Sequence, residues 1–68
     1  MNYELSKRFL YHEATEKQVE KMVEIREKFI ELANLIDEVC PVSREKSLSL
    51  TKLEEASFFA NASIVRYS

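Results

Sequence analysis

Hydrophobic positions in the last third of the chain, from Ser43 to Arg66, recur on two faces of one predicted helix. The segment has no Gly or Pro and starts with a Ser two residues after Pro41, so it predicts a helix ~35 Å long at about 1.5 Å per residue. At about 100° per residue, its apolar residues fall into two nearly opposite stripes. The stripes are Leu50, Leu53, Ala60, Ile64 and Tyr67 on one side, and Leu48, Phe58, Phe59, Ala62 and Val65 on the other. A single neighbouring helix can cover only one of these faces.

A second amphipathic helix is predicted from residue 15 to residue 39. Thr15 and Gln18 have the spacing of a capping box, and Pro41 disfavours helical geometry in the residue before it. The apolar positions form a core-facing stripe and, in the C-terminal half, a second set. The stripe is Val19, Met22, Val23, Phe29, Ile30, Ala33 and Ile36, and the second set is Ile25, Leu32, Leu35 and Val39. This helix also has more apolar surface than a hairpin can cover.

The fold class predicted from these patterns is all-α, with one domain over residues 1–68. The short connection from Cys40 to Ser43 makes the helices 15–39 and 43–66 antiparallel neighbours. Residues 1–14 form a short N-terminal arm or helix. A compact chain of this length buries only ~60% of its unfolded surface, and its single cysteine provides no internal disulfide. We therefore expect the hairpin to assemble into a helical homo-oligomer.

Composition excludes several function classes. A net charge of −2 argues against a general DNA or RNA binder, although a ligand with two or three phosphates needs only a few well-placed cations. No secretory signal is recognised, and no apolar run approaches the ~20 residues that cross a bilayer, so no membrane partner is expected. The lone cysteine fits a reducing cytoplasm.

An enzyme is the class with least support. The chain has no Gly for a phosphate-binding loop, and its single His12 and single Cys40 provide no metal cluster. The acids Glu54 and Glu55 are adjacent on a helix and point about 100° apart, which makes them poor acid and base partners. We predict no catalytic residue, no metal and no cofactor.

Arg26 interrupts the apolar stripe of the helix 15–39. With Val19 at zero, it lies at about −20°, between Val23 and Phe29. A charge in such a position must pair with a carboxylate, extend its guanidinium to solvent, or face an anionic ligand. The residues alone leave all three alternatives open.

Two further segments combine cations with groups that bind nucleotides. In the arm, the ring of Tyr11 could stack on a nucleobase, and the paired N–H donors of Arg8 could bind a phosphate. The alternative is that the aromatic residues of the arm only pack on the helices. Ser43 is the expected N-cap of the last helix, where free backbone N–H groups favour anions. Arg44 and Lys46 follow it, and Arg44, Ser47 and Thr51 share one face. These cations alternatively reach solvent or pair with acids of another chain.

The amino-acid sequence resembles that of one known protein family. CPVSREKSLSLTKLEEASFFANASIVR, from Cys40 to Arg66, resembles the C-terminal helix of small phage anti-CBASS sponge proteins, and RFLYH and LIDEVCP match upstream segments in the same order. The resemblance implies a homohexamer in the host cytoplasm that binds cyclic dinucleotides, such as cyclic GMP–AMP, and cyclic trinucleotides without cleaving them. These signals alert infected bacteria, and the sponge sequesters them.

The same resemblance implies roles for the candidate residues. Tyr11 and Arg26 align without a gap with a Tyr and a Lys that grip the cyclic dinucleotide, and Arg in place of Lys keeps the charge but changes the geometry. The face of Ser43, Arg44, Ser47 and Thr51 is assigned to a cyclic trinucleotide pocket between protomers. The competing hypothesis, favoured by periodicity alone, is a non-catalytic helical-hairpin scaffold or partner-binding protein.

Overall fold

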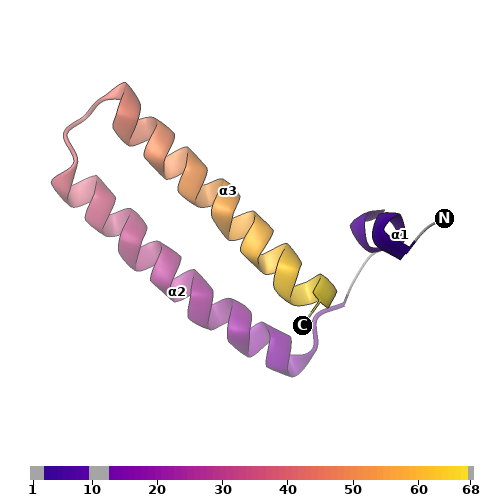
Figure 1. The fold of residues 1–68 in the computed structure, drawn as a ribbon. Helices are drawn as coiled ribbons and strands as arrows, with labels where there is room; N and C mark the ends of the chain where they lie inside the picture. Colours follow the sequence, from indigo (N-terminus) through magenta and orange to yellow (C-terminus); the bar gives the residue numbers. More distant parts are fainter. Residues whose placement is uncertain (1–2, 10–12, 68) are drawn as a thin grey trace.

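The computed structural model describes residues 3–9 and 13–67, and over these residues the chain is all-helical. The elements in order are α1 (Tyr3–Phe9), α2 (Glu16–Val39) and α3 (Arg44–Tyr67) (Figure 1). The predicted all-α hairpin is confirmed. The predicted homo-oligomer is a statement about several chains and stays a prediction.

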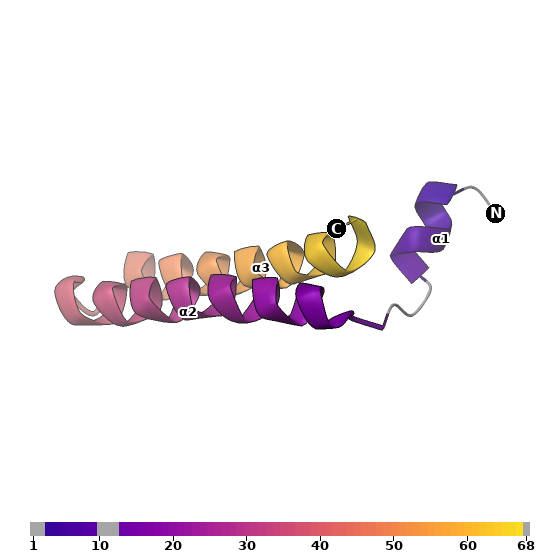
Figure 2. The same cartoon turned by 90° about the horizontal axis from the view of Figure 1, so that it is seen from below.

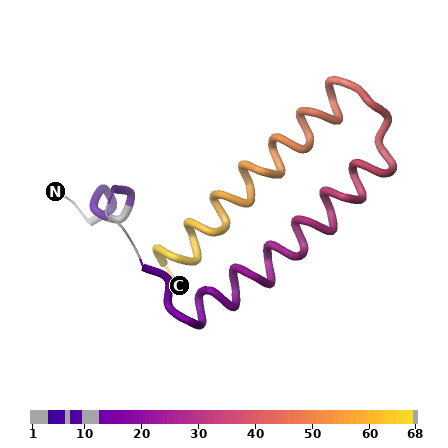
Figure 3. Tube along the Cα trace, turned by 180° about the vertical axis from the view of Figure 1, so that it is seen from behind, coloured from indigo at the N-terminus to yellow at the C-terminus, as the bar shows by residue number. Residues whose placement is uncertain are grey.

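The two long helices lie side by side and antiparallel in a single layer (Figures 1 and 2). The smallest extent of the molecule is 13 Å, against 46 and 26 Å along the other two axes. α1 lies beyond the open end of the hairpin, next to the C-terminal end of α3 (Figure 3). No third layer therefore covers either broad side of the hairpin within the described residues.

α2 begins with the capping box that its sequence predicts. The Gln18 N–H donates to Thr15 Oγ1 at 3.2 Å, and the Thr15 N–H donates to Gln18 Oε1 at 2.9 Å. At the other end the Cys40 N–H donates to the Ile36 carbonyl at 3.0 Å, and Pro41 follows in the non-helical connection. Local sequence signals fix both ends of this helix.

α3 begins at the expected N-cap. Ser43 Oγ accepts from the Lys46 N–H at 3.1 Å and donates to the Pro41 carbonyl at 3.0 Å. The Lys46 side chain then reaches back to α2, where its Nζ lies 3.1 Å from Asp37 Oδ1 and 2.9 Å from the Asp37 carbonyl oxygen. The cap and this ion pair together hold the connection against the end of α2.

The seam between α2 and α3 is narrow. Its partly buried residues recur at intervals of three and four, which is the spacing of one stripe on each helix. They are Met22, Ile25, Phe29, Ala33 and Ile36 on α2, and Leu50, Leu53, Ser57, Ala60 and Ile64 on α3.

The assignment of residues to the core-facing stripe of α2 was wrong at several positions. Val19, Val23 and Ile30 are exposed beside the seam, whereas Ile25, which we placed in the second set, lies within it. The reason is geometric: an apolar helix face wider than one stripe can turn either edge toward a single partner helix. Periodicity gives the width of the face and leaves the rotation of the helix open.

The second apolar stripe of α3 is uncovered over much of its length: Leu48, Phe58 and Phe59 are exposed, whereas Ala62 and Val65 are partly buried. Phe58 is 65% exposed and Phe59 75% exposed, and no hydrophobic residue in the described part of the chain is buried. The accessible surface is 5650 Å², whereas a compact protein of 8.0 kDa exposes ~4,400 Å². The single chain thus exposes more surface than a compact protein of its mass.

The open end of the hairpin is held by polar contacts. Gln18, at 8% exposed the one buried residue in the described ranges, donates from Nε2 to the Ile64 carbonyl at 3.1 Å. Tyr67 Oη donates to the Glu4 carboxylate at 3.2 and 3.3 Å, and Arg66 Nη2 donates to the Arg8 carbonyl at 3.3 Å. The last turn of α3 therefore holds both α1 and the start of α2.

Replacing Gln18 with Ala is expected to lower the free energy of unfolding by about 1–3 kcal/mol, because the Ile64 carbonyl loses its donor and the capping box opens. Urea unfolding followed by circular dichroism, at fixed chain concentration, measures the change. The exposed neighbour Lys17→Ala is the control and should shift stability by less than about 0.5 kcal/mol. Equal effects of the two substitutions would contradict the assigned role of Gln18.

Candidate functional site

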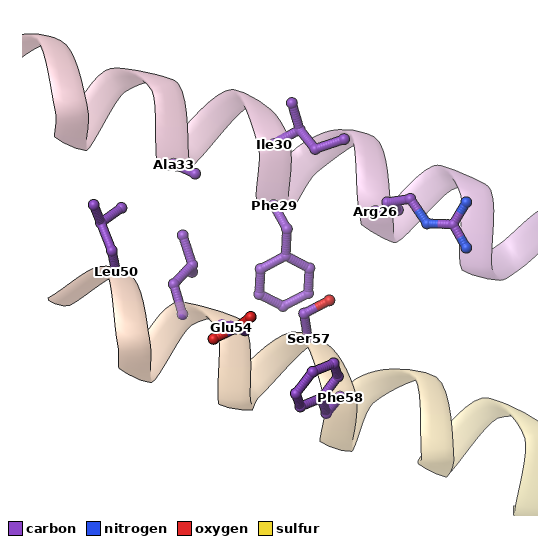
Figure 4. A pocket seen from close by; sticks show the side chains of 9 residues that line it. Arg26, Phe29, Ile30, Ala33, Leu50, Glu54, Ser57 and Phe58 are labelled. Carbon is purple, nitrogen blue, oxygen red and sulfur yellow. The ribbon is translucent and has the colours of Figure 1, made fainter. Parts of the chain in front are cut away.

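An open groove of about 210 Å³ runs between α2 and α3 on one side of the hairpin (Figure 4). Its α2 wall consists of Arg26, Phe29, Ile30 and Ala33, and its α3 wall of Leu50, Leu53, Glu54, Ser57 and Phe58. Six of these nine residues are hydrophobic, so the groove offers an apolar surface with three polar side chains.

The apolar surface of the groove comes from the seam and from residues beside it. Phe29 projects from α2 toward α3, close to Ser57 (Figure 4). Ile30 and Phe58 line the groove from opposite helices and are both exposed to solvent. Such a surface suits a flat, partly apolar group, because flat rings stack on aromatic and aliphatic side chains.

Arg26 lies in the groove wall with its side chain extended along α2, away from Glu54 (Figure 4). It is exposed and makes no ion pair with any residue in the described ranges. Of the three alternatives for this charge, pairing with a carboxylate is therefore not realised among the described residues. The guanidinium is in a position to meet either solvent or an anion that enters the groove.

Glu54 is a groove residue that sequence reasoning missed. We considered it only as one of two adjacent acids with no catalytic use. In the structure, the neighbouring Glu55 pairs with Lys52 at 3.5 Å, whereas Glu54 is exposed and has no ion pair within the described ranges. Its place four residues after Leu50 and four before Phe58 is the signal that would have put it on the groove wall.

The N-terminal candidates are only partly described. Tyr11 lies outside the described residues. Arg8 is on α1, exposed, with its Nε 3.9 Å from Glu4 Oε1. Glu4 also accepts the Tyr67 hydroxyl, and α1 lies at the end of α3 that is remote from the connection.

The candidates at the start of α3, which are Ser43, Arg44, Ser47 and Thr51, are all exposed. The hydroxyl of Ser43 is used in capping, and Lys46 is only 14% exposed because it pairs with Asp37. Arg44 makes no ion pair in the described part of the chain. This helix end therefore presents one available cation where the sequence suggested two.

The start of α3 and the groove belong to one face of the helix. Ser47, Thr51, Glu54 and Phe58 follow one another at intervals of four, three and four residues, which places them in one stripe. Glu54 and Phe58 line the groove, so Ser47 and Thr51 continue its wall toward the connection. The face of Ser47 and Thr51 on α3 therefore adjoins the groove that Arg26 lines from α2.

Neither a metal site nor a membrane span is found in the part of the chain that the structure describes. No three His, Cys, Asp or Glu side chains there come together as a metal site. Among the described helices, none has the length and apolar character needed to cross a membrane.

A two-helix hairpin with an open apolar groove, in which Arg26 and Glu54 make no ion pair with the described residues, puts this protein in the class of small helical-hairpin domains. The chain belongs to the Acb2/Tad1 hairpin domain family, the anti-CBASS sponge family, whose sequence model matches residues 1–65. The resemblance inferred from the sequence is thereby confirmed. No curated protein and no solved structure matches the chain.

Proposed function

We propose that this protein binds cyclic di- and trinucleotide signals in the host cytoplasm and sequesters them without cleavage, which blocks CBASS anti-phage signalling. The observation that carries the proposal is family membership over residues 1–65 of 68. The geometry supports it, because an exposed Arg26 without an ion pair in the described ranges lies in an open apolar groove. A nucleotide suits both features, because its phosphate can bind the Arg26 guanidinium and its base can pack on the apolar wall of the groove.

For the cyclic dinucleotide we propose three contact residues. The guanidinium of Arg26 presents paired N–H donors to a phosphate, and Tyr11 stacks on a base. Arg8 supplies a second cation from α1. Its ion pair with Glu4 is long, at 3.9 Å, and exposed, so exchanging it for a phosphate costs little.

For the cyclic trinucleotide we propose the face formed by Ser43, Arg44, Ser47 and Thr51, at a contact between protomers. Arg44 is the available cation, and Ser47 and Thr51 carry exposed hydroxyls. Ser43 contributes by capping α3, which orients the first backbone N–H groups of the helix toward an anion.

We propose that the chain works as a homo-oligomer, with the hexamer as the expected state. The argument is the uncovered surface: the chain exposes 5650 Å², more than ~1,000 Å² above the value for a compact protein of its mass. Burying such an area against other copies is of the order that stable interfaces require.

Sequestration requires affinity and copy number but no chemistry. By mass action, a pool of free sites at 100 times the dissociation constant leaves only about 1% of the signal free. The function therefore needs no catalytic group, metal or cofactor in the protein.

The alternative function is a non-catalytic hairpin scaffold or partner-binding protein. The exposed Phe58 and Phe59 are the observation in its favour, since they suit a protein partner as well as a copy of the same chain. A scaffold would retain no cyclic nucleotide.

Incubation of the protein with cyclic GMP–AMP, followed by heat denaturation and chromatography, is expected to return the ligand unaltered. Tyr11→Ala and Arg26→Ala should each weaken binding about tenfold or more, because a stacked base and a charge-assisted phosphate contact are each worth ~1–3 kcal/mol. Titration calorimetry measures both affinities.

The matched control for the first variant is Tyr11→Phe, which keeps the ring and should lose much less affinity. Arg26→Ala should leave the fold intact, because the charge it removes is exposed and has no ion pair in the described part of the chain. Wild-type affinity in Arg26→Ala, or recovery of a cleaved ligand, would refute this site or this function respectively.

Arg44→Ala is expected to weaken cyclic trinucleotide binding about tenfold and to leave cyclic dinucleotide binding largely unchanged, because Arg44 is the available cation at the start of α3. Calorimetry with both ligands provides the comparison. Equal loss of both, with the assembly preserved, would show that the trinucleotide pocket lies elsewhere.

Light scattering at micromolar concentration is expected to give the mass of an oligomer, and Phe59→Asp should dissociate or unfold it. Phe59 is 75% exposed in the single chain, so the charge is harmful only if another chain covers this position. A monomeric wild-type mass would disprove the assembly. An unchanged oligomer in Phe59→Asp would place its contacts on other residues.

A further inference from the structure

We propose that Glu54 makes the groove selective for guanine, so that the sponge prefers cyclic dinucleotides that contain this base. The inference rests on the proposed function and assigns base selection within the same site. Its starting point is a carboxylate that lines an otherwise apolar groove and has no ion pair in the described ranges.

The position of Glu54 distinguishes it from the other acids of α3. Glu55 pairs with Lys52 at 3.5 Å. Glu45 is in the first turn of α3, where the helix dipole stabilises an acidic side chain. Neither lines the groove. Glu54 has no such local role, and its carboxylate loses water when a ligand fills the groove, so the ligand must supply hydrogen-bond donors.

The size of the groove limits what it can enclose. Its volume is about 210 Å³, below the roughly 300–1,000 Å³ of pockets that enclose drug-sized ligands. One heterocyclic base therefore fits, and the remainder of a cyclic dinucleotide must lie outside. Ile30 and Phe58, on opposite helices, provide apolar contacts for the faces of the base.

The chemistry of a carboxylate selects among the bases. Its two oxygens only accept hydrogen bonds, so the best partner has two adjacent donors. Guanine offers its N1–H and its 2-amino group side by side. Adenine offers one amino group next to the N1 lone pair, and cytosine one amino group next to the N3 lone pair, and each lone pair repels the second oxygen.

The positive charge of Arg26 in the same groove suits the phosphate of the nucleotide whose base meets Glu54. Arg26 and Glu54 lie on different sides of Phe29, on different helices (Figure 4). A nucleotide carries its base edge and its phosphate at opposite ends, separated by the sugar. Glu54 on the base edge and Arg26 on the phosphate would thus orient the ligand in one direction along the groove.

The competing occupant of the groove is a second copy of the chain, whose Arg26 would pair with Glu54. That arrangement makes Glu54 a contact of the assembly and gives it no role in base selection. The two cases separate experimentally. Removal of the Glu54 charge changes the mass of the assembly only if Glu54 is a contact between copies of the chain.

The experiment is calorimetry on the full chain with cyclic di-GMP and cyclic di-AMP, for the wild type and Glu54→Gln. The wild type should prefer cyclic di-GMP about tenfold or more, and Glu54→Gln should lose about tenfold in affinity for it. A Gln amide presents one acceptor and one donor, which match adenine, so affinity for cyclic di-AMP should stay equal or rise. Light scattering checks that the mass is unchanged.

Glu55→Gln is the matched control, since it removes the same charge one residue away and outside the groove. It should leave both affinities within about twofold. Equal wild-type affinity for the two ligands, equal loss of both in Glu54→Gln, or a changed mass overturns the selection by Glu54 and leaves the proposed function standing. Failure of the wild type to bind either ligand overturns the proposed function and the inference with it.

Discussion

The narrow seam between α2 and α3 is the constraint on which the rest of this structure depends. Two helices in one layer can bury only one stripe of each, here built around Phe29 and Leu53. Most other large apolar side chains are exposed, and no hydrophobic residue in the described ranges is more than partly buried. The stability of the single chain is therefore small, and ligands or other copies that cover the exposed faces add to it directly.

The same constraint allows an open groove to form at a small cost in free energy. Because the hairpin has no third layer in the described residues, the space beside the seam stays open as a groove, and side chains in its walls need no burial before a ligand arrives. Arg26 and Glu54 are both exposed and make no ion pair within the described ranges, and solvent screens side chains in such positions. Entry of the proposed nucleotide would remove that solvent and so strengthen each contact with its phosphate or base.

Polar contacts at the two ends of the hairpin compensate for the small apolar core. Lys46 and Asp37 join the helices beside the connection, and Gln18 joins the start of α2 to the Ile64 carbonyl at the open end. The last turn of α3 also holds α1 through Tyr67. α1 carries Arg8, so the contacts of this last turn also hold a residue proposed to bind the ligand.

The sequence by itself determined the helices, the capping box of Thr15 and Gln18, the cap at Ser43 and the two apolar faces of α3. These features depend on residues three or four apart, whose geometry the helix fixes. Only the tertiary structure decided that Ile25 faces the seam while Ile30 lines a groove, and that Lys46 is occupied by Asp37. It also placed Glu54 and Arg26 in the walls of one groove, on different helices. Each of these outcomes depends on how α2 and α3 are rotated about their own axes, and many rotations satisfy a wide apolar face equally well.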